Sequence, residues 1–508
     1  MKGIVYLVGA GPGDEGLMTL RGAECLREAE VVIYDYLANP ALLRWCPPDA
    51  ELIYAGKSGE RHAVEQGEIN ALLVAKAREG KRVVRLKGGD PYLLGRGGEE
   101  AEALVAEGLP FEVVPGVSSA VAVPAYAGIP VTQRGLASAV TIVTGHEDPT
   151  KPGAAIDWEQ LGKLDSTKVI LMGVTNIEKI AAEFRKHSPG DTPVAMIRWG
   201  TTGRQQTLVA TLADVAERAR EAQFKPPAVI VIGKVVGLRD RLNWFETRPL
   251  FGRRVVVTRT REQASELTRR LQELGADVLE IPTIQIMPPK TDKILCEAIE
   301  GIGEYNWLVF TSPNGVDHFF RVFFNIYHDI RDIGGVKIAA IGPATAARVE
   351  ALHLQVDLQP EESVAEAVIK AFKEKEDLEN LRLLLPQGDL ARDALRDGLE
   401  ALGGIVDAVE CYRTVPETAD VTGNVARLLA EGADAITFTS GSTVENFCKL
   451  VDLVSLRKNF PQLKLASIGP ITSNAIRECG LSVDVEAAQH DIPCLADAVR
   501  TLLTAPTA

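Results

Sequence analysis

The chain has 508 residues, with 46% hydrophobic, 24% charged and 6% aromatic side chains, and its formal net charge is −14. This length exceeds a single hydrophobic core and predicts two to four domains of ordinary globular composition. The acidic balance excludes a broad surface for nucleic acid or membrane, but it is compatible with a local basic pocket for an acidic small molecule.

Seven scattered cysteines form no C-x-x-C pair and no Cys/His cluster, so we expect neither a metal site nor a disulfide framework. A reducing compartment is the simpler interpretation. The N-terminus enters a strand without a signal-peptide pattern, and no apolar run reaches membrane-spanning length. We therefore expect a cytoplasmic protein.

Short apolar strands alternate with amphipathic helices, which predicts an α/β fold. In the first half the predicted strands lie in GIVYLVG (3–9), EVVIYD (30–35), RVVRLKGGD (82–90), FEVVPG (111–116), TIVTG (141–145), KVILMG (168–173), PVAMIRWG (193–200) and AVIVIG (228–233). An amphipathic tail, an aromatic pair and a proline then precede a new strand, RVVVTR. We predict one domain over residues 1–245, a linker over 246–251 and a second domain over 252–508.

The second half contains an internal duplication. Segment 308–320 is similar to 435–447, and segment 339–357 is similar to 466–484, at an offset of 127 or 128 residues. A third fragment, LQELGADV at 271–278, is similar to LEALGGIV at an offset of 128 residues. The repeat predicts two α/β units, each about the size of one small doubly wound domain.

The first glycine cluster raises the question of a dinucleotide site. Glycines 11, 13 and 16 have the G-x-G-x-x-G spacing, and Asp35 ends the next apolar run. That fingerprint requires a turn that opens directly onto a helix. Here the helix is predicted to begin only at Thr19, after the glycines, which argues against a pyrophosphate. A nicotinamide-dependent oxidoreductase is the alternative that this spacing leaves open.

Six motifs follow in order through the first half. They are GAGPGD (9–14), VVIYD (31–35), GK (56–57), RLKGGDPYLLGRGGEE (85–100), VVPGVSSA (113–120) and TGH (144–146). This set resembles the tetrapyrrole methylases, most closely the uroporphyrinogen-III C-methyltransferases, over about residues 1–245. The resemblance implies a fold of two subdomains, S-adenosylmethionine as methyl donor with S-adenosylhomocysteine as product, and a homodimer formed through this half.

The same resemblance implies site residues. Asp35 is the implied proton acceptor and Lys57 the implied proton donor. The residues implied to line the S-adenosylmethionine site are Pro12, Gly88, Gly89, Asp90, Leu93, Ser118, Ser119, Met172, Gly200 and Ala228. Without the resemblance, GGDP at 88–91 is typical of a turn, and Met172 of a strand core. Five basic residues are candidates to bind substrate carboxylates, with an exposed surface charge as the alternative for each: Arg61, Arg85, Lys87, Arg96 and Arg134.

A second ordered set of motifs runs through the other half. They are VVVTR (255–259), FTSPNGV (310–316), IGPATA (341–346), LPQGDLARDALRDGL (385–399), VECYRT (409–414), FTSGSTVENF (438–447) and IGPITS (468–473). Over about residues 252–505 this set looks like uroporphyrinogen-III synthase. The resemblance implies a pair of flavodoxin-like lobes, and Tyr412 as donor of a proton to the departing hydroxyl; a hinge anchor is the alternative for this tyrosine.

Hydroxyl side chains in this half stand where strands end and helices begin: Thr311, Ser312, Thr345, Thr439, Ser440 and Thr472. Hydroxyls there cap helices, yet hydroxyls and amides at several helix N-termini can also bind carboxylates. Arg259 and Arg392 are further candidates to pair with substrate carboxylates, with surface salt bridges as the alternative. The synthase half implies no cofactor.

The two resemblances together imply one bifunctional enzyme. Its second half would cyclise hydroxymethylbilane to uroporphyrinogen III, and its first half would methylate that product twice to precorrin-2. The family pattern implies one lobe over about 252–288 plus 417–505 and another over 290–414, joined by two hinge strands. A methylase of a later corrin intermediate and a ligand-sensing second half are the remaining alternatives. The pathway branch, sirohaem or cobalamin, stays open.

Overall fold

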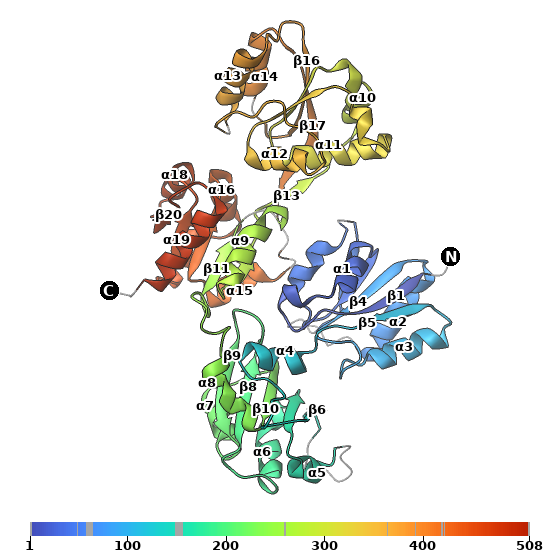
Figure 1. Ribbon diagram of the computed structural model, residues 1–508, viewed down its shortest axis with the longest axis vertical. Coiled ribbons are helices and arrows are strands. Elements are labelled where there is room, and N and C mark those ends of the chain that lie inside the picture. Colours follow the sequence, from blue (N-terminus) through green and yellow to red (C-terminus); the bar gives the residue numbers. More distant parts are fainter. Residues whose placement is uncertain are drawn as a thin grey trace.

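The structure, a computed structural model, describes residues 3–47, 49–56, 65–147, 156–258, 261–362, 364–391, 393–417, 420 and 422–505. Four five-stranded sheets account for its architecture, two in each half of the sequence. Figure 1 shows each sheet with its own helices as a separate body, which confirms the predicted α/β class.

The first sheet is entirely parallel, in the order β3-β2-β4-β1-β5. Its strands are β1 (Ile4–Gly9), β2 (Val31–Tyr34), β3 (Glu51–Tyr54), β4 (Arg82–Lys87) and β5 (Phe111–Val114). Its helices are η1 (Glu15–Leu17), α1 (Leu20–Arg27), η2 (Pro40–Trp45), α2 (Gln66–Arg78) and α3 (Gly97–Ala106). The run of apolar residues in β1 and β2 follows from burial on both faces, since helices cover a parallel sheet on each side.

The start of α1 answers the question raised by the first glycines. Thr19 is its N-cap, and the Thr19 hydroxyl accepts a hydrogen bond from the amide of Gly22 at 3.1 Å. The helix therefore begins after all three glycines, as the sequence predicts. The third glycine, Gly16, lies inside the three-residue 3₁₀ helix η1, whose N-cap is Asp14.

The second sheet is mixed, in the order β6-β7-β10-β8-β9, with one parallel pair, β6 with β7. Its strands are β6 (Val140–Thr144), β7 (Thr167–Leu171), β8 (Pro193–Arg198), β9 (Gln206–Thr211) and β10 (Ala228–Ile232). Its helices are α4 (Ser119–Tyr126), α5 (Trp158–Lys163), η3 (Val174–Asn176), α6 (Ile177–Arg185), α7 (Val215–Glu221), η4 (Lys234–Leu238) and α8 (Arg239–Leu242). Helix α4 leads from the first sheet to the second.

The segment between the two halves is packed. Phe245 is buried against Tyr126 and Phe251, and Leu250 is fully buried in the core of the next lobe. Glu246 accepts hydrogen bonds from Gln205 and Thr207 and ion-pairs with a neighbouring arginine of α8. These contacts hold the second sheet against the lobe that follows it.

The third sheet is parallel, in the order β12-β11-β18-β19-β20, which is the flavodoxin-like order 2-1-3-4-5. Its strands are β11 (Arg254–Val257), β12 (Asp277–Glu280), β18 (Ala435–Phe438), β19 (Lys464–Ser467) and β20 (Val485–Glu486). Its helices are α9 (Arg261–Glu273), α15 (Asn424–Glu431), α16 (Gly441–Leu450), α17 (Leu453–Asn459), α18 (Pro470–Glu478) and α19 (Ile492–Thr504). We call this body the first lobe.

The fourth sheet has the order β13-β17-β16-β14-β15, and its edge strand β13 is antiparallel to β17. Its strands are β13 (Ile284–Met287), β14 (Trp307–Phe310), β15 (Lys337–Ala340), β16 (Arg382–Gly388) and β17 (Ile405–Pro416). Its helices are α10 (Lys293–Glu300), η5 (Ile302–Glu304), α11 (Pro313–Ile326), η6 (Ile330–Ile333), α12 (Pro343–Glu350), α13 (Ala365–Lys375) and α14 (Ala394–Ala401). We call this body the second lobe; β13 and the end of β17 run between the lobes (Figure 1).

The internal duplication is distributed between the lobes. In the first lobe β12-β11-β18-β19 lie in the same spatial order as β17-β16-β14-β15 in the second. The repeated segments 308–320 and 435–447 therefore occupy equivalent places in different lobes. Each sequence repeat contributes one half to each lobe, because β11 pairs with the distant β18.

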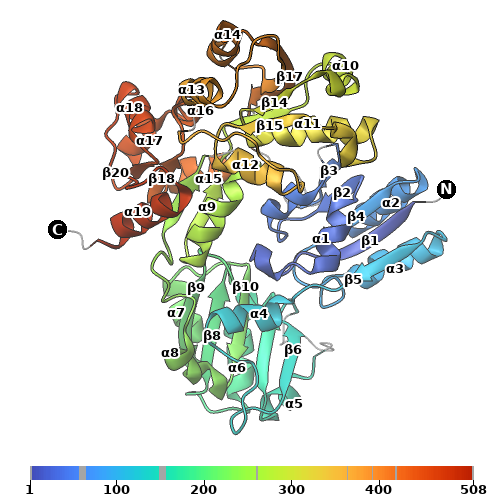
Figure 2. The same ribbon diagram turned by 45° about the horizontal axis from the view of Figure 1, so that its top comes forward.

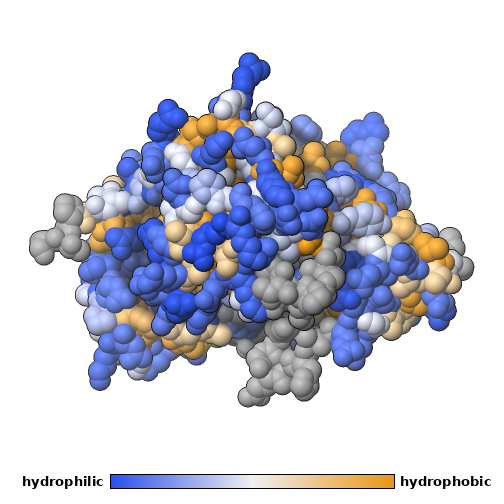
Figure 3. Space-filling model, turned by 90° about the horizontal axis from the view of Figure 1, so that it is seen from below, coloured by the Kyte–Doolittle hydropathy of each residue, from blue (hydrophilic) through white to orange (hydrophobic). Residues whose placement is uncertain are grey.

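Figures 1 and 2 both place α9 beside the β8–β9 end of the second sheet, and Figure 1 shows β11 next to α9. Hydrophilic residues cover most of the face seen from below, and the hydrophobic residues on it form separate smaller patches (Figure 3). Within the described ranges no helix has the length and apolar character needed to cross a membrane.

Candidate active site

The carboxyl ends of the first sheet's strands converge on one large cavity. Pro12 follows β1, Asp35 follows β2, and the glycines of GGDP follow β4. Ligands of open α/β sheets bind at this edge. The cavity has a volume of about 1300 Å³. Its lining includes ten predicted donor-site residues and Asp35: Pro12, Asp35, Gly88, Gly89, Asp90, Leu93, Ser118, Ser119, Met172, Gly200 and Ala228. Lys57 lies outside the described residues.

Glycines allow the loops at this edge to touch backbone to backbone. A Cβ on Gly116 would lie 2.2 Å from the carbonyl oxygen of Gly89 and 2.7 Å from the Cα of Gly9. The amide of Gly89 donates to the carbonyl of Gly11 at 2.7 Å, and the amide of Gly11 donates back at 3.2 Å. Side chains at these positions would separate the loops that form the floor of the cavity.

Asp90 holds two of these loops together. One carboxylate oxygen accepts from the amides of Tyr92 and Leu93 at 2.9 Å, and the other accepts from the amide of Gly116 at 3.1 Å. The segment GGDP therefore forms a turn, as its sequence predicts. A carboxylate offers about four lone-pair sites, so three amide contacts leave capacity for a ligand hydroxyl or amine.

Unusual backbone conformations gather at the cavity. Five lining residues other than glycine have positive φ angles: Leu94 (55°), Arg96 (60°), Met172 (58°), Trp199 (48°) and Thr201 (68°). Such conformations are uncommon and cluster where a ligand is gripped. Met172 is 51% exposed, so it is not the strand core residue that its sequence context suggests.

A buried charge network orients Asp35. Arg85 donates to Asp35 at 3.0 Å and to Glu100 at 3.1 Å, and Lys87 donates to Glu100 at 2.7 Å. Arg85, Lys87 and Glu100 are each less than 5% exposed. Burial, and then the neighbouring Arg85, lower the pKa of Lys87. The two cations are therefore structural partners of acids and not exposed carboxylate clamps. Glu100 could not be identified from the sequence, because the local residue pattern of α3 does not indicate that this glutamate is buried.

Other basic candidates have different environments. Arg96 lines the cavity and pairs with Glu99 at 2.7 Å, and Arg134 is exposed. Arg61 lies outside the described residues. Among the described His, Cys, Asp and Glu side chains, no group of three is placed to hold a metal ion.

In the second lobe, Tyr412 and Ser312 are brought together. Tyr412 extends from β17, and its hydroxyl lies 3.1 Å from the hydroxyl of Ser312 at the N-cap of α11. Gly388 leaves room for the tyrosine ring, since a Cβ there would lie 2.6 Å from it. Burial raises the pKa of Tyr412, and the hydrogen bond between its hydroxyl and that of Ser312 opposes this shift. The phenol is therefore kept protonated around neutral pH.

The remaining hydroxyls divide between the lobes. Thr311 and Thr345 lie with Tyr412 on the second lobe, while Thr439, Ser440 and Thr472 lie on the first. Ser440 caps α16 and accepts from the amide of Thr443 at 3.3 Å, which is the helix-capping role. Thr345 and Thr472 are 3% exposed. Arg259 and Arg392 lie outside the described residues.

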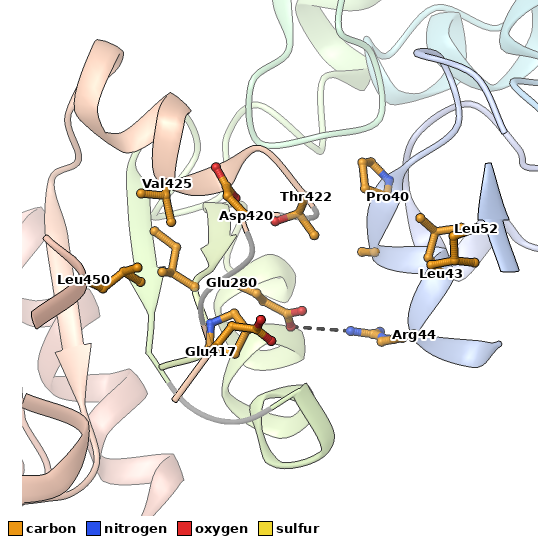
Figure 4. A pocket seen from close by; sticks show the side chains of 13 residues that line it. Pro40, Leu43, Arg44, Leu52, Glu280, Glu417, Asp420, Thr422, Val425 and Leu450 are labelled. Carbon is orange, nitrogen blue, oxygen red and sulfur yellow. Dashed lines mark hydrogen bonds and ion pairs between the residues drawn. The ribbon is translucent and has the colours of Figure 1, made fainter. Parts of the chain in front are cut away.

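The first lobe also contacts the domain that carries the large cavity. Arg44 of η2 pairs with Glu280 of β12 at 3.4 Å (Figure 4). The same arginine also pairs with Glu15. Gly203, in the turn between β8 and β9, lies on the backbone of residues 276–277, where a Cβ would come within 2.3 Å of the amide nitrogen of Asp277. The large cavity is accordingly lined by residues of both halves, including Asp277 and Arg427.

Comparison with known proteins gives two family matches. Residues 4–216 match the model of the tetrapyrrole (corrin/porphyrin) methylases, and residues 265–497 match that of uroporphyrinogen-III synthase HemD. A porphyrin biosynthesis protein HemD of Ruminiclostridium josui is 38% identical over 487 residues, covering 94% of each chain. This relative shares both halves.

Two further relatives match the first half. An S-adenosyl-L-methionine-dependent uroporphyrinogen III methyltransferase of Methanosarcina barkeri is 56% identical over 241 residues, 47% of this chain and 94% of the relative. A crystal structure of uroporphyrin-III C-methyl transferase from Thermus thermophilus, complexed with S-adenyl homocysteine, is 39% identical and covers 46% of this chain and 100% of its own, with a TM-score of 0.40.

Proposed function

The chain belongs to the tetrapyrrole methylases in its first half and to the uroporphyrinogen-III synthases in its second, and we propose that it catalyses two consecutive steps. The second half cyclises hydroxymethylbilane to uroporphyrinogen III with inversion of the last ring. The first half methylates that macrocycle twice to precorrin-2. The observation that carries the first assignment is the cavity lined by Asp35 and all ten predicted donor-site residues.

The cavity suits a methyl donor without phosphates. Its loops meet through glycines, and the first α-helix, α1, starts only after them, so the glycine loop does not open directly onto an α-helix as a pyrophosphate site requires. A volume of about 1300 Å³ exceeds that of a single drug-sized ligand site and has room for a donor and a macrocycle together. Bound S-adenosylmethionine supplies an electrophilic methyl group on a sulfonium centre.

The protein's task in methyl transfer is positioning followed by proton removal. The loops that carry Pro12, Gly89 and Ser118 bound the donor subsite, and close in-line approach of a pyrrole carbon supplies most of the rate. Asp35 then accepts the proton that leaves the methylated ring. Its carboxylate is held by Arg85 and by the amide of Leu37 at 3.0 Å, which leaves further lone pairs for that proton. Lys57 stays the predicted proton donor.

In the synthase half, the Tyr412 phenol donates a proton to the departing hydroxyl of the bilane. Its raised pKa keeps the proton available, and Ser312 orients the phenol oxygen. The hydroxyls on the first lobe bind carboxylates of the bilane when the lobes approach each other. We further propose that the protein is a cytoplasmic homodimer formed through the methylase half.

One assay tests both activities in the purified chain. Hydroxymethylbilane and isotopically labelled S-adenosylmethionine are supplied, and a doubly methylated tetrapyrrole is expected. Spontaneous closure gives the uninverted isomer, so isomer analysis reports the synthase half separately. If the chain methylates supplied uroporphyrinogen III but does not form it from hydroxymethylbilane, only the methylase assignment is supported. Activity only on a later corrin intermediate would refute it.

A further inference from the structure

Arg204 stands in the wall of the large cavity and has no carboxylate partner in the part of the chain that the structure describes. It follows Gly203 in the turn between β8 and β9, and its guanidinium lies over the ring of Trp199, 4.3 Å from the ring centre. No carboxylate among the described residues forms an ion pair with it. Burial, and then the neighbouring Arg427, lower the pKa of Arg204.

The four charged side chains that act most strongly on Arg204 come from the synthase half, and together with Arg204 they carry one positive charge in excess. Asp277 pairs with Arg254 at 2.8 Å and with Arg427. Glu431 pairs with the same two arginines, at 2.7 and 3.2 Å. Two carboxylates are thus shared by two guanidiniums, and Arg204 is the third guanidinium beside them. A partly buried cation in this position favours an incoming anion.

Docking of the two halves fixes this arrangement. Gly203 lies directly on the backbone of residues 276–277, where any side chain would collide with main-chain atoms. The same turn reaches the first glycine loop, because the hydroxyl of Thr201 accepts from the amide of Asp14 at 3.0 Å. Arg204 therefore stands between the donor loop and the synthase lobe, and both Arg204 and Arg427 line the cavity.

We propose that Arg204, supported by Arg427 of the first lobe, forms a carboxylate-binding subsite for the macrocyclic substrate of the methylase. The synthase half thereby supplies part of the binding site of the other half. This inference rests on the proposed function, in which the substrate carries eight carboxylates around its rim. Guanidinium groups bind carboxylates through paired hydrogen bonds, and the contact with the Trp199 ring restrains the Arg204 side chain within the cavity wall.

The test uses the full chain and two ligands that do not react. Uroporphyrin III, the oxidised octacarboxylate, probes the macrocycle site through its fluorescence, and S-adenosylhomocysteine probes the donor site by calorimetry. Arg204→Gln is expected to weaken uroporphyrin binding roughly tenfold or more at low salt and to leave S-adenosylhomocysteine binding unchanged. The difference should shrink as salt rises. Arg220→Gln, an exposed arginine on α7, is the matched control.

A second variant changes the charge in the opposite direction. Glu431→Gln on α15 removes one of the two carboxylates and should tighten uroporphyrin binding roughly two- to fivefold. Glu431 is half exposed, so the change is mild, and a loss of folding would not tighten binding. The control is Glu445→Gln, an exposed acid on α16 of the same lobe.

The outcomes separate the two proposals. If the unaltered chain neither binds uroporphyrin nor methylates uroporphyrinogen III, the proposed function fails. If the unaltered chain does both, but Arg204→Gln binds uroporphyrin normally or loses S-adenosylhomocysteine to the same extent, the subsite assignment is overturned. Unchanged or weaker binding in Glu431→Gln overturns the contribution of the synthase half.

Discussion

The two halves of the molecule assemble their candidate sites in different ways. In the methylase half, loops from two sheets meet in one preformed cavity, fastened by glycine contacts and by Asp90. In the synthase half, the candidate residues are divided between two lobes joined by β13 and the end of β17. The loops of the first site are already in contact with one another, whereas the candidate residues of the second site stand on two separate lobes.

This difference predicts which of the two activities a given substitution will affect. A substitution in the preformed cavity should affect methyl transfer alone, because the loops are already in contact. A substitution of a candidate residue in one lobe should slow cyclisation and leave methyl transfer unchanged. The following predictions test that separation, from the largest expected effect to the smallest.

Replacing Asp35 by Asn should have the largest effect. The amide keeps the shape and the hydrogen bond from Leu37 but cannot accept the proton from the methylated ring, so methyl transfer should fall about 100- to 10,000-fold. Radiolabel transfer to uroporphyrinogen III measures this rate. S-adenosylhomocysteine binding and cyclisation serve as internal controls. Near-normal methyl transfer in this variant would remove Asp35 from the mechanism.

Replacing Tyr412 by Phe should slow cyclisation about 100-fold and leave methylation of supplied uroporphyrinogen III unchanged. The fraction of uninverted isomer should rise because spontaneous closure then competes. Isomer analysis by chromatography gives the result, with Tyr305→Phe as control, a tyrosine that pairs with Asp407 elsewhere in the lobe. A normal isomer ratio would favour the hinge-anchor interpretation of Tyr412.

The pH profile of cyclisation sharpens the assignment of Tyr412. The protonated phenol is the active form, so activity is lost as pH rises through its pKa. Because burial raises that pKa above the ordinary value near 10, the rate should not decline on the alkaline side until above about pH 10. A decline centred near pH 8 that Tyr412→Phe abolishes would contradict the raised pKa.

Replacing Gly116 by Ala tests the preformed cavity. The new Cβ would lie 2.2 Å from the carbonyl oxygen of Gly89, so the loops must separate, at a cost of about 3 kcal/mol. Methyl donor binding should weaken while cyclisation persists, as measured by calorimetry and by bilane turnover. Gly237→Ala is the control, because a Cβ there meets no atom within 4 Å. Equal stability of the two variants would contradict the tight loop packing.

Replacing Arg44 by Gln should have the smallest effect, about 1 kcal/mol of unfolding free energy at pH 8. Burial raises the pKa of Glu15, and Arg44 opposes that shift, so the variant leaves an unpaired buried acid. The loss should be present above the pKa of Glu15 and should vanish as pH falls and the acid is protonated. Denaturant unfolding at pH 8 and pH 5 measures it, with Arg331→Gln as exposed control. A larger loss at pH 5 would contradict this sign.

Several features followed from local chemistry alone. Thr19 capped its helix as predicted, because a threonine before an amphipathic run satisfies an orphan amide wherever it stands. The strand pattern predicted the α/β class, and the 128-residue repeat indicated two related units. These features depend on neighbours in sequence, which the chain itself displays.

Other features required the tertiary structure. Three of these features join segments that are distant in sequence. They are the burial of Glu100, the division of each sequence repeat between the two lobes, and the proximity of Arg204 to Arg427. Gly203 gives no sign in the sequence that it lies against Asp277, since its lack of a side chain matters only once another backbone is placed there. Local propensity depends on near neighbours, whereas a shared cavity depends on how separately folded bodies dock.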